Sequence, residues 1–252
     1  MKTVKILMLL AALTTVWGCT KEDDTIDRIM TFEKAVKPTW KVDLTSNDTA
    51  PIWTAPDPTL FESSMFIMVR LQDELKPFST DDDLMSVFIG DECRTVPAVR
   101  NVDDKGDIFF MLKIRGNSTD RDVTLSLCYY CAGLHQLFTL RGQERFATER
   151  TYGVNEDFTP PLLKGSSKYP VQTTLTVNIT ENEYIKADEG DIVAAFVGNE
   201  CRGVGKLGEP FTVFRTNESE IIQLRYYSTE KGGVYTTRDI FYPKGNDIYT
   251  LI

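Results

Sequence analysis

The sequence predicts an all-β protein built from two tandem antiparallel β-sandwich domains. Three observations lead to this prediction. Apolar residues recur at every second position in several short runs, a spacing that gives a strand one buried face. Few stretches show the period of an amphipathic helix, and turn-forming residues separate the runs. An internal repeat assigns the same strand order to both halves. Together these patterns are typical of Ig-like or jelly-roll-like sandwiches.

The repeat is strongest in two matching segments. Residues 83–94 read DLMSVFIGDECR and residues 191–202 read DIVAAFVGNECR, with six of twelve positions identical. Two further pairs of segments occur in the same order: 65–71 with 173–179, and 127–130 with 224–227. Chance is a poor explanation for three matches in one order, so we expect two copies of one fold.

Each matching segment contains a predicted hairpin, most simply a type II′ turn with glycine first, at Gly90-Asp91 and at Gly198-Asn199. A two-residue turn sets the register of the strands on either side. It pairs Phe88 with Cys93 and Phe196 with Cys201, and we expect these four side chains to face the core. The same face would hold Leu84, Ser86, Ile192 and Ala194.

Arg94 and Arg202 follow the two cysteines and lie on the opposite face, where each can form a partly exposed ion pair with the glutamate two residues before it. A cysteine beside an arginine can be an activated thiolate. The hairpin register instead turns Cys93 and Cys201 away from the arginines, which favours buried, structural thiols.

Cys128 and Cys131 occur in the first copy alone, since Arg225 stands where the second copy would have Cys128. We expect Cys128 to lie on the face opposite Leu127 and Tyr129, away from Cys93. A local Cys128-Cys131 disulfide in an exported domain is one interpretation, and two free thiols are another. Redox catalysis fits less well, because the motif does not follow a βαβ pattern.

Composition argues against several functions. With 37 acidic and 28 basic side chains the formal charge is −9, which disfavours binding to nucleic acid. His135 is the one imidazole, and motifs for nucleophilic, phosphate-binding or metal chemistry are absent from the sequence. We therefore expect no enzymatic activity, no cofactor and no metal site. Acidic clusters at 81–83 and 188–191 are more typical of solvated turns than of a calcium site.

Aromatic residues are the remaining functional lead. Adjacent tyrosines on a strand point to opposite faces, so one of Tyr129 and Tyr130, and one of Tyr226 and Tyr227, is expected on the outer side. An exposed ring can stack on a sugar or anchor a protein interface, and it can equally cap a sheet.

The first eighteen residues have the layout of an export signal. Lys2 and Lys5 form a basic start, and the apolar run at 6–16 is too short to span a bilayer. The stretch LTTVWGC at 13–19 resembles a bacterial lipobox, which implies acylation of Cys19 and anchoring by the attached lipid. An ordinary secretory signal with an incidental cysteine is the alternative.

The next residues, KEDD at 21–24, resemble the lysine-plus-acidic export signal of surface-exposed lipoproteins in Bacteroidota, and they can also act as a solvated tether. Two tripeptides look like the O-glycosylation acceptor of the same bacteria, which makes Thr25 and Thr49 the candidate acceptors. The expected organisation is a signal peptide at 1–18, a tether at 19–38, a first sandwich domain at 39–158 and a second at 159–252.

The pattern at 191–204 resembles a repeat of uncharacterised Bacteroidota surface lipoproteins and other secreted cell-surface proteins, and the first copy departs from it at Ser86 and Thr95. The resemblance implies a non-enzymatic module on the extracellular side of the outer membrane. Lipoproteins of this kind are often parts of SusC/SusD-like nutrient importers, so a binding or accessory subunit for a glycan or peptide is expected. Adhesion or a surface-structural role, and an enzyme that degrades polymers, are the alternatives.

Overall fold

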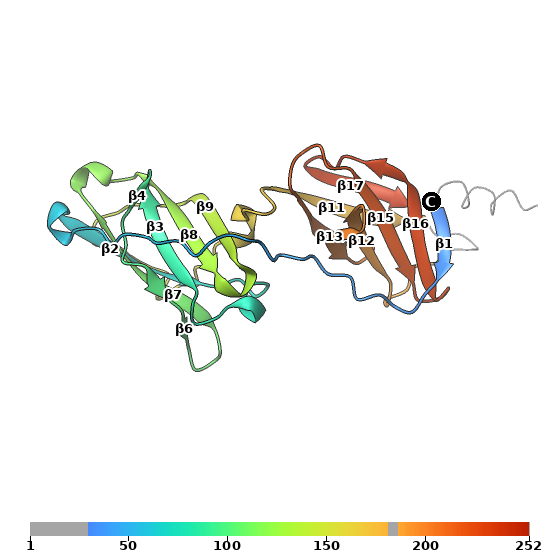
Figure 1. Ribbon diagram of the computed structural model, residues 1–252, viewed down its shortest axis with the longest axis horizontal. Helices are drawn as coiled ribbons and strands as arrows, with labels where there is room; N and C mark the ends of the chain where they lie inside the picture. The colour runs from blue at the N-terminus through green and yellow to red at the C-terminus, as the bar shows by residue number, and fades with distance from the viewer. Residues whose placement is uncertain (1–29, 181–185, 252) are drawn as a thin grey trace, which may run out of the picture.

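The computed structural model describes residues 30–180 and 186–251, which form strands joined by turns and short 3₁₀ helices. The all-β prediction is confirmed, since the described residues include no α-helix. Figure 1 shows two lobes along the long axis of the molecule. We call the part built from β2 to β10 the first lobe and the part built around β11 to β17 the second lobe. The 3₁₀ helices are η1 (Pro58–Leu60), η2 (Lys76–Phe78), η3 (Ser118–Asp120), η4 (Ala132–Leu134) and η5 (Leu162–Gly165).

The first lobe is a sandwich of two sheets with strand orders β10-β2-β7-β6 and β4-β3-β8-β9, and β5 pairs with β3. Alternate residues of each strand point inward and form one hydrophobic cluster, which includes Met65, Ile67, Phe110, Leu112 and Tyr129. The strands are β2 (Ser63–Arg70), β3 (Leu84–Ile89), β4 (Glu92–Cys93), β5 (Ala98–Val99), β6 (Asn101–Val102), β7 (Ile108–Gly116), β8 (Thr124–Cys131), β9 (Gln136–Arg145) and β10 (Thr151–Tyr152).

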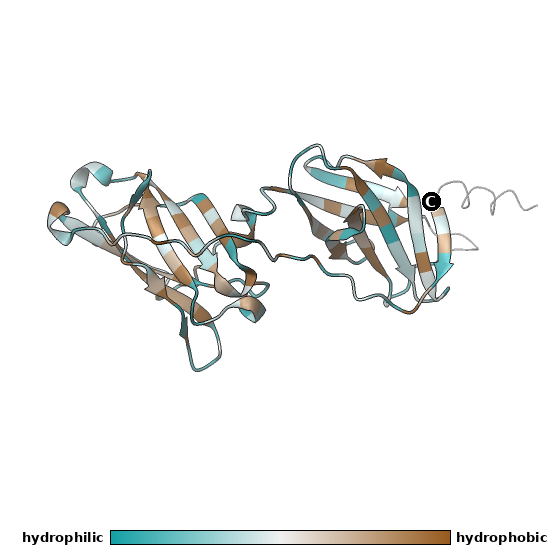
Figure 2. Ribbon diagram, in the orientation of Figure 1, coloured by the Kyte–Doolittle hydropathy of each residue, from teal (hydrophilic) through white to brown (hydrophobic). Residues whose placement is uncertain are grey.

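The second lobe has its own hydrophobic cluster, which includes Leu175, Val177, Val213, Leu224 and Tyr226. Its sheets have the orders β1-β16-β15-β12-β13 and β14-β11-β17. Figure 2 shows apolar positions recurring along the strands of both lobes, as one-sided burial of a strand requires. The strands are β1 (Met30–Lys34), β11 (Val171–Ile179), β12 (Ile192–Val197), β13 (Glu200–Gly205), β14 (Pro210–Arg215), β15 (Ile222–Ser228), β16 (Gly233–Phe241) and β17 (Asn246–Leu251).

Both predicted hairpins are present. Gly90 and Gly198 have φ values of +60° and +59°, in the left-handed region that glycine adopts at little cost. The residues that follow them, Asp91 and Asn199, do not have positive φ values. A positive φ at the first central position alone is the property of a type II′ turn, so the predicted turn type agrees with the structure.

The strand register also follows the prediction next to each turn. Phe88 pairs with Cys93, and Phe196 pairs with Cys201. In the second hairpin a β-bulge then shifts the register, so that Ala195 pairs with Gly203.

The expected core face of β3 and β12 is wrong. The core contains Met85 and Val87 from β3, and Val193 and Ala195 from β12. The side chains one position away, including Phe88, therefore lie on the outer face. Both strands are mainly apolar on both faces, with Ser86 as the one polar residue, so alternation did not identify the inner face.

An N-terminal segment covers the outer faces of both lobes. β1 pairs antiparallel with β16 of the second lobe, and its first residue, Met30, lies in the second-lobe core. Residues 35–57, which we call the strap, run from β1 along the molecule to the first lobe (Figure 1). Part of the predicted tether at 19–38 is thus a strand. Because the chain of the first lobe lies between β1 and β11, the two lobes are not simply arranged in tandem.

One tryptophan of the strap packs against each lobe. The rings of Trp40 and Phe196 are 5.7 Å apart between centroids and meet at 80°, and those of Trp53 and Phe88 are 6.1 Å apart and meet at 72°. Edge-to-face contacts of this kind are favourable beyond the area they bury. The two phenylalanines occupy equivalent positions of the repeat, so the strap contacts the same repeat position twice.

Hydrogen bonds hold the strap between these two ring contacts. The backbone N–H of Ser46 donates to Leu134 O, and that of Asp48 donates to His135 O, both at 2.8 Å. The carboxylate of Asp48 accepts from the backbone N–H of Leu137 at 2.7 Å. At the connection between the lobes, Lys168 Nζ donates to Asp43 O at 2.8 Å and to Thr45 O at 2.6 Å.

We expect Trp53→Ala to lower the free energy of unfolding by about 1–3 kcal/mol, because it removes a ring contact and exposes the outer face of β3 to water. Urea unfolding followed by circular dichroism measures this change. Ile52→Ala is the control: its side chain is 97% exposed, and its truncation should change stability by less than about 0.5 kcal/mol. Equal effects of the two substitutions would contradict the covering role of the strap.

Candidate functional site

The aspartate that begins each copy of the repeat is a buried structural anchor. Asp83 is fully buried and accepts hydrogen bonds from Tyr129 Oη at 2.6 Å and from the backbone N–H of Ala132 at 2.8 Å. Asp191 accepts equivalent bonds from Tyr226 Oη and from the backbone N–H of Thr229. Burial raises the pKa of both tyrosines, which therefore remain hydrogen-bond donors at neutral pH. The signal that could have found these pairs is the identity of Asp and Tyr at the same places of both copies.

The two repeat arginines are buried and paired with carboxylates. Arg94 lies 3.1 Å from Glu92 and 2.8 Å from Asp120. Arg202 lies 2.9 Å from Glu200 and 3.3 Å from Glu220. The predicted pair is present in each copy, and a second acid from outside the motif completes it. A side-chain hydrogen bond from Arg94 holds the pKa of Asp120 below its usual value, against an opposing contribution from burial.

The repeat cysteines are half-buried and engage backbone carbonyls. Cys93 Sγ lies 3.2 Å from Thr95 O, and Cys201 Sγ lies 3.6 Å from Gly203 O. They lie on the outer face with Phe88 and Phe196, so their predicted place in the core is wrong. Burial raises the pKa of the Cys201 thiol, which disfavours the nucleophilic thiolate.

The candidate Cys128-Cys131 disulfide is not formed, and both thiols are free. The two residues lie three positions apart in the single strand β8, so their side chains point to opposite faces and cannot reach each other. Burial raises the pKa of Cys128, and burial with the nearby charge of Asp83 raises that of Cys131 to about 11. Cys128 lies on the outer face, opposite to the face of Tyr129, as predicted. Cys93 lies on the same outer face, so the predicted separation of Cys128 from Cys93 is wrong.

Of the other residues that the sequence singled out as candidate sites, some lie outside the described residues and some within them. Cys19 and Thr25 lie outside the described residues, so their predicted modifications stay predictions. Thr49 is exposed on the strap. His135 is exposed, has a φ of +46° and sits at the end of η4. Tyr130 and Tyr227 are on outer faces, as predicted, and they are only 4% and 7% exposed, which favours the sheet-capping interpretation over stacking on a ligand.

No group of three or more His, Cys, Asp or Glu side chains in the described part of the chain is placed to hold a metal ion. No helix within residues 30–180 and 186–251 is long and apolar enough to cross a membrane.

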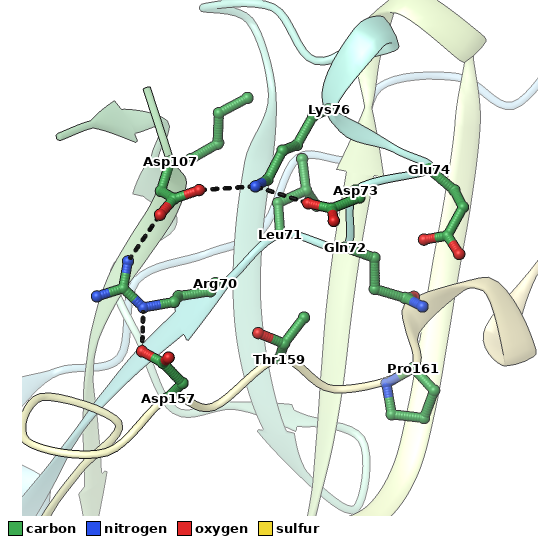
Figure 3. A pocket seen from close by; sticks show the side chains of 11 residues that line it. Arg70, Leu71, Gln72, Asp73, Glu74, Lys76, Asp107, Asp157, Thr159 and Pro161 are labelled. Atoms are coloured by element: carbon green, nitrogen blue, oxygen red, sulfur yellow. Dashed lines mark hydrogen bonds and ion pairs between the residues drawn. The ribbon is translucent and has the colours of Figure 1, made fainter. Parts of the chain in front are cut away.

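A charged cleft of about 400 Å³ opens in the first lobe, and Figure 3 shows the side chains that line it. Arg70 comes from the end of β2, Asp107 and Ile108 lie at the start of β7, and the remaining side chains come from the segments after β2 and β10. The cleft is lined by Arg70, Leu71, Gln72, Asp73, Glu74, Lys76, Asp107, Ile108, Asp157, Thr159 and Pro161.

The charges in the cleft form a connected network (Figure 3). Lys76 Nζ lies 2.7 Å from both Asp73 Oδ1 and Asp107 Oδ1, and the hydrogen bond to Asp107 is the main cause that raises the pKa of Lys76. Arg70 Nε lies 2.9 Å from Asp157. Of the four acids that line the cleft, these three are engaged with cations. The cleft therefore presents fixed hydrogen-bonding groups to a polar ligand.

Comparison with known proteins found neither a matching family model nor a matching curated protein. One solved structure, a leucine-rich repeat protein from Bacteroides thetaiotaomicron VPI-5482, matches with 9% sequence identity and a TM-score of 0.22. The match covers 75% of this chain and 25% of that one. A TM-score this low carries no argument about fold or function.

We expect Asp120→Asn to destabilise the protein by about 1–3 kcal/mol at pH 7, because it breaks a hydrogen bond between charged groups at a buried arginine. The lowered pKa of Asp120 contributes stability that is present above its unfolded value and lost as pH falls through the folded value. The wild type should therefore lose more stability than the variant in urea titrations from pH 6 down to pH 2.5. Asp81→Asn, which breaks an exposed pair with Arg100, should cost less than about 1 kcal/mol. A parallel pH dependence of wild type and Asp120→Asn would refute this.

We expect Cys128, Cys131 and Cys201 to react with iodoacetamide at pH 8 at least roughly tenfold more slowly in the folded chain than in urea, because burial limits access and the thiolate is the reacting form. Mass spectrometry of the labelled peptides gives the rates. The same digest without reductant should show Cys128 and Cys131 unlinked, and a peptide that holds them as a disulfide would contradict the structure.

Proposed function

We propose that this protein is a non-enzymatic, lipid-anchored binding subunit at the outer face of the outer membrane, which serves a SusC/SusD-like importer of glycans or peptides. The observation that carries the binding role is the charged cleft of the first lobe. Its volume of about 400 Å³ falls within the usual range of ligand sites. Its guanidinium, amide, hydroxyl and carboxylate groups match the donors and acceptors of a hydroxyl-rich or amide-rich ligand.

The chemistry of the titratable groups supports binding in preference to catalysis. Acid–base catalysis needs a group that exchanges a proton with the substrate. Asp73, Asp107 and Asp157 are instead held by Lys76 and Arg70. Raised thiol pKa values at Cys128, Cys131 and Cys201 likewise argue against a cysteine nucleophile.

The position of β1 supports a surface role for the cleft. If Cys19 carries the lipid, ten residues separate it from Met30, and they span at most about 35 Å when fully extended. β1 belongs to the second lobe, so the second lobe would lie next to the membrane. The first lobe, with its cleft, would then be the part that faces the medium.

Adhesion or a surface-structural role is the second candidate, and the elongated arrangement in Figure 1 favours it. The strap joins both lobes along their length, which suits a spacer that holds a distal module away from the membrane. Deletion of the gene would separate the two roles: a changed attachment with unchanged growth on every glycan and peptide source favours adhesion.

The cleft is tested with the full, lipid-bearing chain purified in detergent and screened against oligosaccharides and peptides. For a ligand found in this way, Asp73→Asn with Glu74→Gln should weaken binding about tenfold, since both side chains line the cleft and are exposed. Glu62→Gln with Asp104→Asn makes the same change of charge at exposed sites outside the cleft and should leave affinity unchanged.

A cross-linking pull-down from solubilised outer membranes tests the importer. Recovery of an importer subunit supports the proposal. Recovery of none, together with no glycan or peptide binding, would refute it, and hydrolysis that is lost on replacing one carboxylate would establish an enzyme instead.

A further inference from the structure

The second lobe has a larger cavity, of about 720 Å³, where β11 begins and β14 ends. Arg215 closes one side at the end of β14, and Gln172 and Thr173 line the cavity from β11. Tyr242 and Lys244 come from the connection between β16 and β17. An adjoining cavity of about 360 Å³ shares Gln172, Thr173 and Gly245 with it and adds Lys164.

Arg215 is a buried cation with no carboxylate partner. It is 3% exposed, and no acid of the described chain lies within ion-pair distance of it. Its guanidinium donates from Nη1 to Glu218 O at 2.9 Å and from Nη2 to Pro243 O at 3.2 Å, while Nε has no partner. A guanidinium has five N–H donors, so these two bonds leave donors unused.

The two buried repeat arginines show what Arg215, which lies outside the repeat motif, lacks. Arg94 and Arg202 are buried to a similar degree, and each is paired with two carboxylates. Burying a charge is costly unless an opposite charge or a full set of hydrogen bonds compensates for it. The two carbonyl oxygens compensate Arg215 in part, and an anionic group in the cavity would complete the balance.

Two lysines near Arg215 add to the positive charge of the cavity lining. Lys164 and Lys244 are exposed, and neither is in an ion pair with a described residue. Among the residues that line the two cavities, Glu218 is the single acid against three cations. In a chain whose formal charge is −9, this is a local reversal that favours an anion over a cation.

The rest of the lining suits a sugar. Tyr242 is 50% exposed and offers a ring face on which a saccharide can stack. Gln172 Nε2 already donates to Leu163 O and Tyr169 O, and Ser219 Oγ donates to Asn217 Oδ1. Their side-chain oxygen atoms serve as acceptors for sugar hydroxyls, and the hydroxyl of Thr173, which has no partner among the described residues, offers a donor as well. We propose that this cavity binds an acidic saccharide, with its carboxylate or sulfate toward Arg215 and Lys244 and a ring against Tyr242.

This site is separate from the charged cleft, which lies in the other lobe and is lined by more acids than bases. The two sites would therefore select differently charged parts of a ligand, or different ligands. Substitutions that abolish binding at one of them should therefore leave binding at the other unchanged.

The test is isothermal titration calorimetry on the full, lipid-bearing chain in detergent, with three probes: a galacturonic acid oligosaccharide, a sulfated oligosaccharide and a neutral oligosaccharide of the same length. We expect one or both acidic probes to bind and the neutral probe to bind at least about tenfold more weakly. Raising the salt from 50 to 500 mM should weaken the acidic binding, because the lysines are exposed to screening. Which acidic probe binds identifies the anionic group.

Arg215 also donates hydrogen bonds to two loops, at Glu218 O and Pro243 O, so its replacement would disturb the fold as well as the cavity. The lysines are therefore substituted in the test. Lys164→Ala with Lys244→Ala should weaken acidic binding about tenfold, and Tyr242→Ala should weaken it as well. Lys105→Ala with Lys113→Ala removes two exposed charges from the first lobe and should have no effect. The proposal fails if neither acidic probe binds, if the neutral probe binds as tightly, or if the two lysine pairs behave alike.

Discussion

An apolar face of a β-sheet must be covered, and in this protein the central strands β3 and β12 have two such faces. The inner faces pack into the two sandwich cores. The outer faces present Phe88 and Phe196 at the same repeat position, and the strap covers each with a tryptophan. This requirement accounts for the path of residues 35–57, for β1 in the second lobe and for the contacts between the strap and the connection of the lobes.

The two lobes pair their buried aspartate and buried arginine with the same kinds of partner. Each buries an aspartate under a tyrosine hydroxyl and a backbone N–H. Each also buries an arginine between two carboxylates. Buried polar groups satisfied in this way specify one arrangement of the strands around them. Arg215, which has carbonyl partners and no acid, departs from that pattern, and it lies in the wall of the largest cavity described above.

Features that depend on neighbouring residues could be predicted, and features that depend on residues far apart in the sequence could not. Gly90 and Gly198 specify two-residue turns, and a two-residue turn sets the register next to it. The inner face of β3 could not be deduced with certainty from alternation, because both sets of alternate residues in LMSVFI are mainly apolar, with Ser86 as the one polar residue. The path of the strap could not be predicted, because its short alternating run at 40–44 is typical of a strand and its contacts are with partners far away in sequence. Asp120, Glu220 and the residues of both cavities come together through tertiary structure alone, and the repeat motif does not point to them.

The pairing of β1 with β16 makes the second lobe depend on two segments that lie on either side of the first lobe in the sequence. Met30 pairs with Thr237, so the sheet of the second lobe cannot be complete until the chain has been synthesised as far as β16. Pairings this distant in sequence form late, since a long loop must close first. A chain cut short before β16 would leave Met30 without its core and the strap without its fixed start. Closure of this one ladder therefore fixes the second-lobe sheet and the start of the strap in the same late step.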